Sequence, residues 1–276
     1  MDRYVDTIWL RWTIACIVAF SCVACSTPAM TPQPSPATVS ELAPSGKLRA
    51  AINFGNPVLA SKDPATGEPR GVSVDLSREL ARRLGVPLEL VTFTSAGKVV
   101  EDVKSNAWDV AFVAIDPVRG ADMDQTTPYV IIEGVYLVPV ASPIKANAEV
   151  DRSGVRVVVA KGSAYDLYLT RELKSAQLFR VPTSAVVVDT LVTGNYEVAA
   201  GVRQQLEGDA KRVPNVRLLD GRFMVINQAM AVPIGRPAGA RYVGEFVESM
   251  KASGFVAESL KRNGIEGAAV APRGGP

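Results

Sequence analysis

Arg119 is the residue whose type and position best suit ligand chemistry in this chain. It follows the apolar segment 108–115 after a short turn. A guanidinium offers two parallel N–H donors that match a carboxylate, and its charge is permanent. The local pattern by itself favours a solvated loop arginine beside Asp122 and Asp124, so the residues alone do not make Arg119 a ligand contact.

A second candidate for anion binding is the dipeptide Gly162-Ser163. It stands where an apolar strand predicted at 155–160 turns into a helix predicted at 164–173. Backbone N–H groups at a helix N-terminus, together with a serine hydroxyl, form an anion site. An ordinary helix cap explains Ser163 equally well.

The composition excludes several kinds of chemistry. The 276 residues include no histidine, which removes Ser–His triads, histidine metal ligands and histidine acid–base catalysis. The three cysteines, Cys16, Cys22 and Cys25, all lie near the N-terminus, so the rest of the chain has no disulfide and no cysteine nucleophile. A net charge of +2 gives no indication of a nucleic-acid partner. We expect neither a metal nor a cofactor.

Residues 1–25 predict an export signal. Arginines precede a short apolar run that ends in small residues, and the run is too short to span a membrane. Residues 23–25 (VAC) are similar to the end of a bacterial lipobox, so Cys25 is either lipidated, which gives a lipid anchor, or follows an ordinary cleaved signal. Residues 26–45, rich in Pro, Ser and Thr, predict a disordered tether. We therefore expect a periplasmic protein.

From residue 47 onward the sequence alternates apolar strands with amphipathic helices. Apolar residues recur at four-residue spacing from Val72 to Leu84, with charged residues on the other face, which predicts a helix. The segment 108–115 is almost wholly apolar, as in a strand that helices cover on both faces. Two successive strand–helix cycles of this kind predict two α/β lobes.

Several motifs occur in a specific order along the chain. They are GKLR at 46–49, GVSVDL at 71–76, DVAFVAIDPVR at 109–119, TTPY at 126–129, Gly162-Ser163 and LVTGNYE at 191–197. In this order the chain resembles the bacterial extracellular solute-binding proteins of family 3, the amino-acid-binding type. The resemblance implies the type II periplasmic binding protein fold, in which two Rossmann-like α/β lobes are joined by two crossover strands, here expected at 133–140 and 224–232. The ligand then lies in the cleft between the lobes.

The resemblance also implies a division of the chain. The expected parts are a signal peptide at 1–25, a tether at 26–45, lobe 1 at 46–137 plus 228–266, lobe 2 at 138–227 and a disordered tail at 267–276. The expected partners are a small solute that carries a carboxylate and the permease of an ABC transporter. We expect a monomer.

In the family, an arginine at the position of Arg119 clamps the ligand's carboxylate, and an aromatic residue at the position of Phe54 packs against the ligand. Further contacts are expected from residues that end strands or begin helices. They are Ala114, Asp116, Gly162, Ser163, Ala164, Val202 and Arg203.

One position departs from the family pattern. Amino-acid binders hold the ligand's α-ammonium with an acidic residue, and Val202 stands at that position here, beside Arg203. A buried ammonium that faces valine is poorly paired, which is costly. Either Asp116 replaces the missing acid, or the ligand is an organic acid without an α-ammonium and Arg203 binds a second anionic group.

The function implied by the resemblance is binding without catalysis. The protein closes on an amino acid or related organic acid and delivers it to the permease. One alternative is a periplasmic dehydratase of prephenate- or arogenate-like acids on the same fold, with Glu133, Asp116 or Glu197 as the proton donor. Another is a ligand sensor that presents its closed form to a membrane receptor.

Overall fold

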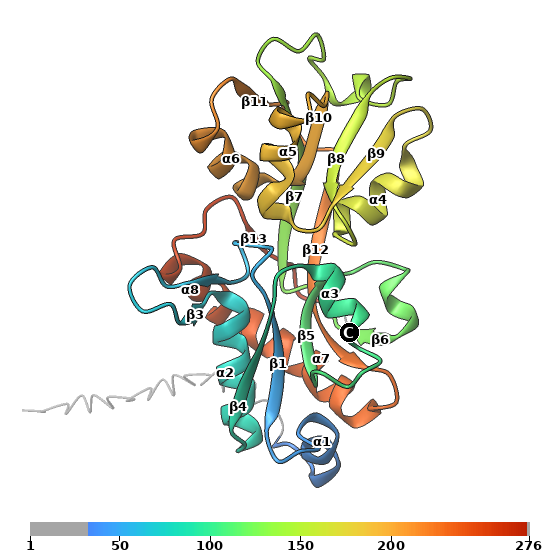
Figure 1. Ribbon diagram of the computed structural model, residues 1–276. Coiled ribbons are helices and arrows are strands. Elements are labelled where there is room, and N and C mark those ends of the chain that lie inside the picture. The colour runs from blue at the N-terminus through green and yellow to red at the C-terminus, as the bar shows by residue number, and fades with distance from the viewer. Residues whose placement is uncertain (1–32, 275–276) are drawn as a thin grey trace, which may run out of the picture. The chain divides into compact units, whose positions relative to one another are not determined.

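The computed structural model describes residues 33–274 (Figure 1). The expected signal peptide and the lipidation expected at Cys25 therefore lie outside the described residues. No helix in the described range is long and apolar enough to cross a membrane.

The described residues form a mixed, eleven-stranded sheet. Its main path runs, in order, through β4 (Leu88–Phe93), β1 (Leu48–Asn53), β5 (Val110–Ala114), β12 (Met224–Pro233), β7 (Val130–Pro139), β10 (Val198–Val202), β8 (Arg156–Ala160) and β9 (Gln177–Val181). The short strands β11 (Val216–Leu218) and β13 (Ala269–Val270) pair with β7, and β6 (Met123–Gln125) pairs with β12. A separate two-stranded ribbon joins β2 (Ser61–Lys62) to β3 (Pro69–Arg70). Strand β1 is parallel to β4 and β5, and β8 is parallel to β9 and β10.

The two long strands β7 and β12 connect the two parallel groups (Figure 1). Strand β12 pairs with β5 through residues 228–231 and with β7 through 224–228. Strand β7 continues from β12 to pair with β10 through 134–137. Each strand thus runs from one parallel group into the other, which confirms the predicted two-lobed fold with two crossover strands.

Helices follow most strands, as expected when both faces of a parallel sheet are covered. They are α1 (Pro36–Leu42), α2 (Val72–Leu84), α3 (Ala96–Glu101), α4 (Ala164–Glu172), α5 (Val187–Thr193), α6 (Arg203–Arg212), α7 (Pro237–Ala252) and α8 (Phe255–Arg262), with short 3-10 turns at Arg119–Ala121, Asn147–Glu149 and Ser184–Val186. Helix α2 has the predicted bounds. It ends at Gly85 in the left-handed conformation, where a glycine costs least.

Part of the predicted tether is folded, so that prediction is wrong for its second half. Ser35 caps α1, with its Oγ accepting a hydrogen bond from Thr38 N at 3.1 Å. Leu42 is fully buried, and Glu41 Oε2 accepts a hydrogen bond from Gly239 N in α7 at 2.7 Å. The helix has only seven residues and is too short to show a periodic apolar pattern, which explains why composition alone predicted disorder.

The predicted disorder of the C-terminal tail is also wrong, for residues 269–274. Strand β13 pairs with the start of β7, and Ala271 N donates to Tyr129 O at 3.1 Å. The nearly buried Lys251 Nζ donates to Pro272 O at 2.9 Å. These bonds join the tail to groups far away in the sequence, so its local composition gave no indication of them.

Leu42→Ala is expected to lower the free energy of unfolding by about 2 to 4 kcal/mol, because it leaves a cavity between α1 and α7. Urea denaturation of residues 33–276 measures this change. The exposed Ser40 on the same helix provides the control, and Ser40→Ala should stay within about 0.5 kcal/mol of the wild type. Equal effects of the two substitutions would mean that α1 does not belong to the folded domain.

Candidate functional site

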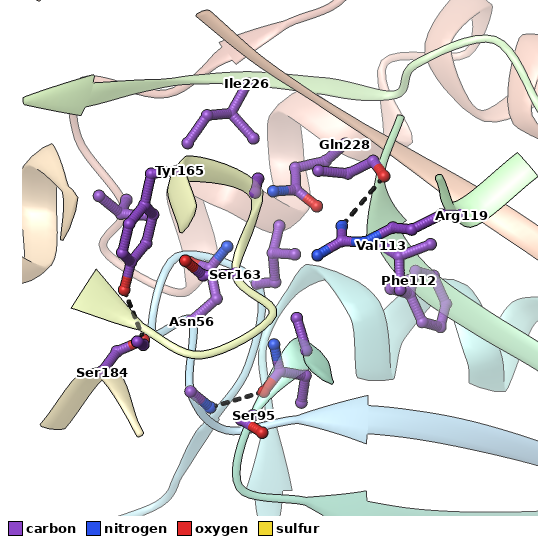
Figure 2. A pocket seen from close by; sticks show the side chains of 18 of the residues that line it. Asn56, Ser95, Phe112, Val113, Arg119, Ser163, Tyr165, Ser184, Ile226 and Gln228 are labelled. Carbon is purple, nitrogen blue, oxygen red and sulfur yellow. Dashed lines mark hydrogen bonds between the residues drawn. The ribbon is translucent and has the colours of Figure 1, made fainter. Parts of the chain in front are cut away.

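A small buried cavity of about 40 Å³ lies where loops and helix starts from both parallel groups of strands meet (Figure 2). A single water needs about 10 to 15 Å³ measured in this way, so the cavity has room for a few non-hydrogen atoms. Its lining is formed by Asn53, Gly55, Asn56, Leu59, Ser95, Ala96, Phe112, Val113, Ala114, Arg119, Ala160, Lys161, Ser163, Ala164, Tyr165, Ser184, Val202, Ile226 and Gln228.

Arg119 is a buried cation in this lining, with only 2% of its surface exposed. Its Nη1 donates to Ala114 O at 3.1 Å and its Nη2 to Gly162 O at 2.8 Å. Its buried Nε has no hydrogen-bond partner among the described residues. Burial lowers the pKa of Arg119 from its usual 12.5 to about 10, against a smaller opposing effect of the nearby Asp116 charge. The site therefore holds a desolvated positive charge with unused donors.

The turn after β5 places Arg119. Asp116 Oδ1 accepts a hydrogen bond from Val118 N at 2.9 Å, and Arg119 N donates to Asp116 O at 3.1 Å. The other carboxylate oxygen of Asp116 pairs with Arg171 Nη2 at 3.0 Å. Asp116 thus stabilises the turn and connects it to α4, and it lies outside the lining of the cavity.

The dipeptide Gly162-Ser163 begins α4, and Ser163 lines the cavity. Ser163 Oγ accepts a hydrogen bond from Asp166 N at 3.0 Å, so this serine is a helix cap. Gly162 has φ +71 and donates its N–H to Asp166 Oδ2 at 2.8 Å. Because Asp166 already accepts this N–H, it is not available to a ligand. The carbonyl oxygen of Gly162 instead accepts a hydrogen bond from Arg119 Nη2. Ala164, the next residue, also lines the cavity.

Seven polar residues of the lining were not identified as contacts from the sequence: Asn53, Asn56, Ser95, Lys161, Tyr165, Ser184 and Gln228. Asn53 ends β1 and Asn56 lies in the loop after it, and their Oδ1 atoms accept hydrogen bonds from Gly55 N at 2.8 Å and Val58 N at 3.2 Å. Gln228 and Ser184 are both buried. Gln228 carried a usable signal, because it is a polar residue within the otherwise apolar run that forms the second half of β12.

Figure 2 shows Tyr165 pointing toward Ser184, and their hydroxyl oxygens are 3.0 Å apart. Tyr165 is buried, with 3% of its surface exposed, so this bond uses hydroxyl groups that water does not reach. The pair closes one side of the cavity.

Of the other predicted contacts, Ala114 and Val202 line the cavity, whereas Phe54 and Arg203 do not. Phe54 lines a second cavity of about 560 Å³, which shares Gly55 with the first. Arg203 pairs with Glu133 at 2.7 Å and donates to a backbone carbonyl at 2.6 Å.

Two glycines allow the segments around the cavity to approach closely. A Cβ at Gly97, in α3, would lie 2.9 Å from Lys161 O, and a Cβ at Gly162 would lie 2.8 Å from Gly97 Cα. Both separations are too short for a real side chain. Together with the bond from Arg119 to the Gly162 carbonyl, this contact joins the loop after β8 to the group of strands that contains β5.

A two-lobed α/β fold joined by two crossover strands, with a cavity lined by residues of both lobes, is the architecture of a solute-binding protein. The sequence model of the bacterial extracellular solute-binding proteins, family 3, matches residues 48–264. The chain belongs to this family.

Individual relatives are distant. The chain is 23% identical over 237 residues to a glutamine-binding protein of Geobacillus stearothermophilus, which covers 79% of this chain and 90% of that protein. The solute receptor for L-cysteine of Neisseria gonorrhoeae has a similar structure, with a TM-score of 0.72, 24% identity, and coverage of 82% of this chain and 93% of that one. An ancestral amino acid-binding protein, a precursor of cyclohexadienyl dehydratase, also has a similar structure. Its TM-score is 0.69 and its sequence identity 22%, with coverage of 82% of this chain and 98% of that one. At this identity the two structures support the fold alone.

Arg119→Met is expected to leave the ligand-free protein as stable as the wild type or to stabilise it, by up to about 3 kcal/mol. The substitution removes a buried charge whose pKa has fallen from 12.5 to about 10, at about 1.4 kcal/mol for each pH unit. Ala114 O keeps a second partner, Gln125 Nε2 at 3.0 Å. Urea denaturation at pH 7 measures the effect, and a loss of more than about 2 kcal/mol would show that the hydrogen bonds of Arg119 outweigh its desolvation.

Proposed function

We propose that this protein is exported to the periplasm, closes on a small solute through the solute's carboxylate, and delivers the solute to an ABC permease. Membership of the solute-binding family supports the class of function. The observation that carries the choice of solute is the buried, partly unsatisfied guanidinium of Arg119.

The donors of Arg119 suit a carboxylate. A guanidinium has five N–H donors, and the two hydrogen bonds to backbone carbonyls use two of them. The Nε–H and two others remain. A carboxylate has two oxygens that accept parallel N–H groups, and its negative charge compensates the buried positive one. Ala114, Ser163, Ala164 and Val202 complete the proposed contacts as lining residues.

In this proposal Asp116 and Arg203 act by holding the surrounding loops, because Arg171 and Glu133 already neutralise their charges. Phe54 lies at the neighbouring cavity and would contact only a solute that extends there. The protein acts as a monomer. If Cys25 is lipidated, it anchors the chain to a membrane.

The ionisation of the three candidate proton donors argues against the dehydratase alternative. Arg222 and Arg203 lower the pKa of Glu133, and Arg156 lowers the pKa of Glu197. Both carboxyl groups are therefore ionised at neutral pH and have no proton to give to a leaving hydroxyl. Asp116, the third candidate, is paired with Arg171.

A thermal-shift screen of residues 33–276 against carboxylic acids tests the proposal. At least one acid is expected to raise the melting temperature by an amount that grows with its concentration, because it binds the folded state alone. Arg119→Met should abolish the shift. If no carboxylic acid stabilises the wild type, or the variant responds equally, the proposed role of Arg119 is wrong.

Gly97→Ala tests whether binding requires the close glycine contact. Alanine suits a helix better than glycine, so the variant should fold normally, yet its Cβ would clash with Lys161 O in the closed form. We expect at least about a tenfold loss of affinity, measured by calorimetry with the acid that gives the largest thermal shift. Gly208→Ala, in α6, is the matched control, because a Cβ there meets nothing within 4 Å. Unchanged affinity in Gly97→Ala would mean that the bound form is more open.

A further inference from the structure

We infer that the solute has no α-ammonium group and is a short monocarboxylic acid with a neutral oxo or hydroxyl oxygen beside the carboxylate. This inference rests on the proposed function, since it takes Arg119 as the anchor of the carboxylate. It concerns the group on the carbon next to the carboxylate. The charge and polarity of the cavity lining constrain that group independently of Arg119.

The first argument is the charge of the lining. Its two charged residues, Arg119 and Lys161, are both cationic, and within the described residues 33–274 no Asp or Glu lines the cavity. A zwitterionic amino acid would bring a second positive charge into a site that already holds a buried one. A carboxylate with a neutral substituent brings only a negative charge, which compensates the positive charge of Arg119.

The second argument is that two acidic side chains next to lining residues, Asp116 and Asp166, are already paired. Asp116 Oδ2 lies 3.0 Å from Arg171 Nη2. Asp166 Oδ1 lies 2.9 Å from Arg180 Nε, and its Oδ2 accepts the Gly162 N–H at 2.8 Å. Both carboxylates are almost completely buried in these contacts. Turning either one toward the cavity would leave a cation unpaired and a loop without its hydrogen bonds, which costs more than a hydrogen bond to an ammonium returns.

The third argument is the polarity of the hydrogen-bonding groups. The side-chain oxygens of Asn53 and Asn56 already accept backbone N–H groups, and so do the hydroxyl oxygens of Ser95 and Ser163. The hydrogen-bonding groups that these side chains can still direct at a ligand are mainly N–H and O–H donors. An ammonium has three donors and no acceptor, whereas a carbonyl or hydroxyl oxygen accepts. At these four side chains a neutral oxygen therefore fits better than an ammonium.

The fourth argument is the position of Val202. It is the N-cap residue of α6, lines the cavity, is 5% exposed and makes no side-chain cap bond. Aspartate is among the best N-cap residues, so the helix itself would favour an acid here. Valine instead adds an apolar side chain to a lining that also includes Ile226 and Phe112. Apolar side chains suit the carbon skeleton of the solute, and they leave an ammonium desolvated without a counter-charge.

The experiment compares acids that share a carbon skeleton and differ only at the α position. The probes are L-lactate, pyruvate and L-alanine, with L-phenyllactate and L-phenylalanine as a larger pair, titrated calorimetrically into residues 33–276. We expect the hydroxy or oxo acid of at least one set to bind at least about tenfold more tightly than its amino acid, the ratio that one unpaired buried charge readily produces. Arg119→Met should abolish this binding.

Val202→Asp supplies the missing carboxylate at a helix start that accepts it, and Val202→Asn is the control of equal shape without charge. Val202→Asp is expected to reverse the preference, so that the amino acid of the pair binds at least about tenfold more tightly than the hydroxy acid. Val202→Asn should show no such gain. Urea denaturation of both variants establishes that they fold.

The outcomes separate this inference from the proposed function. If the wild type binds an amino acid as tightly as its hydroxy or oxo analogue, and Arg119→Met abolishes that binding, the inference is wrong and the carboxylate anchor stands. If none of these acids binds, the inference is wrong, and the thermal-shift screen alone decides the proposed function. If binding does not depend on Arg119, both are wrong. A Val202→Asp variant that folds and gains no preference for the amino acid also overturns the inference.

Discussion

The proposed site depends on one costly interaction, the burial of the Arg119 guanidinium without a carboxylate partner among the described residues. A fall in its pKa from 12.5 to about 10 corresponds to about 3 kcal/mol for keeping the charged form. That is a large share of the stability of an ordinary domain. A fold retains such a group when something else compensates the charge, and two backbone carbonyls do so only partly.

The surrounding elements hold this charge in place more than they neutralise it. The turn after β5 fixes the backbone of Arg119 through Asp116, which is itself tied to Arg171 of α4. The Gly162 carbonyl is fixed in turn, because Asp166 binds the N–H of the same residue. Both carboxylates near the site are therefore engaged with the surrounding loops. This arrangement orients a guanidinium toward a cavity and gives it no internal counter-charge.

The sequence predicted the fold and the place of Arg119 after a buried strand, because both depend on local patterns. The apolar spacing of α2 and the position of Arg119 after a buried strand can be seen within a dozen residues. The remaining polar lining could not be predicted in this way, since Asn53 and Gln228 meet only when β1 and β12 are placed in one sheet. The same reason explains α1, which is ordered by its contact with a helix almost two hundred residues away.

The cost of the buried charge also explains how closure can report occupancy. The contact between Gly97 and Gly162, and the bond from Arg119 to the Gly162 carbonyl, join the two groups of strands, so separating the groups would break both. In the proposed function, closing an empty site buries Arg119 without a counter-charge, which costs free energy, whereas closing around a carboxylate pairs the charge. The unpaired arginine would thus make the closed state depend on the solute, and a built-in carboxylate partner would remove that dependence.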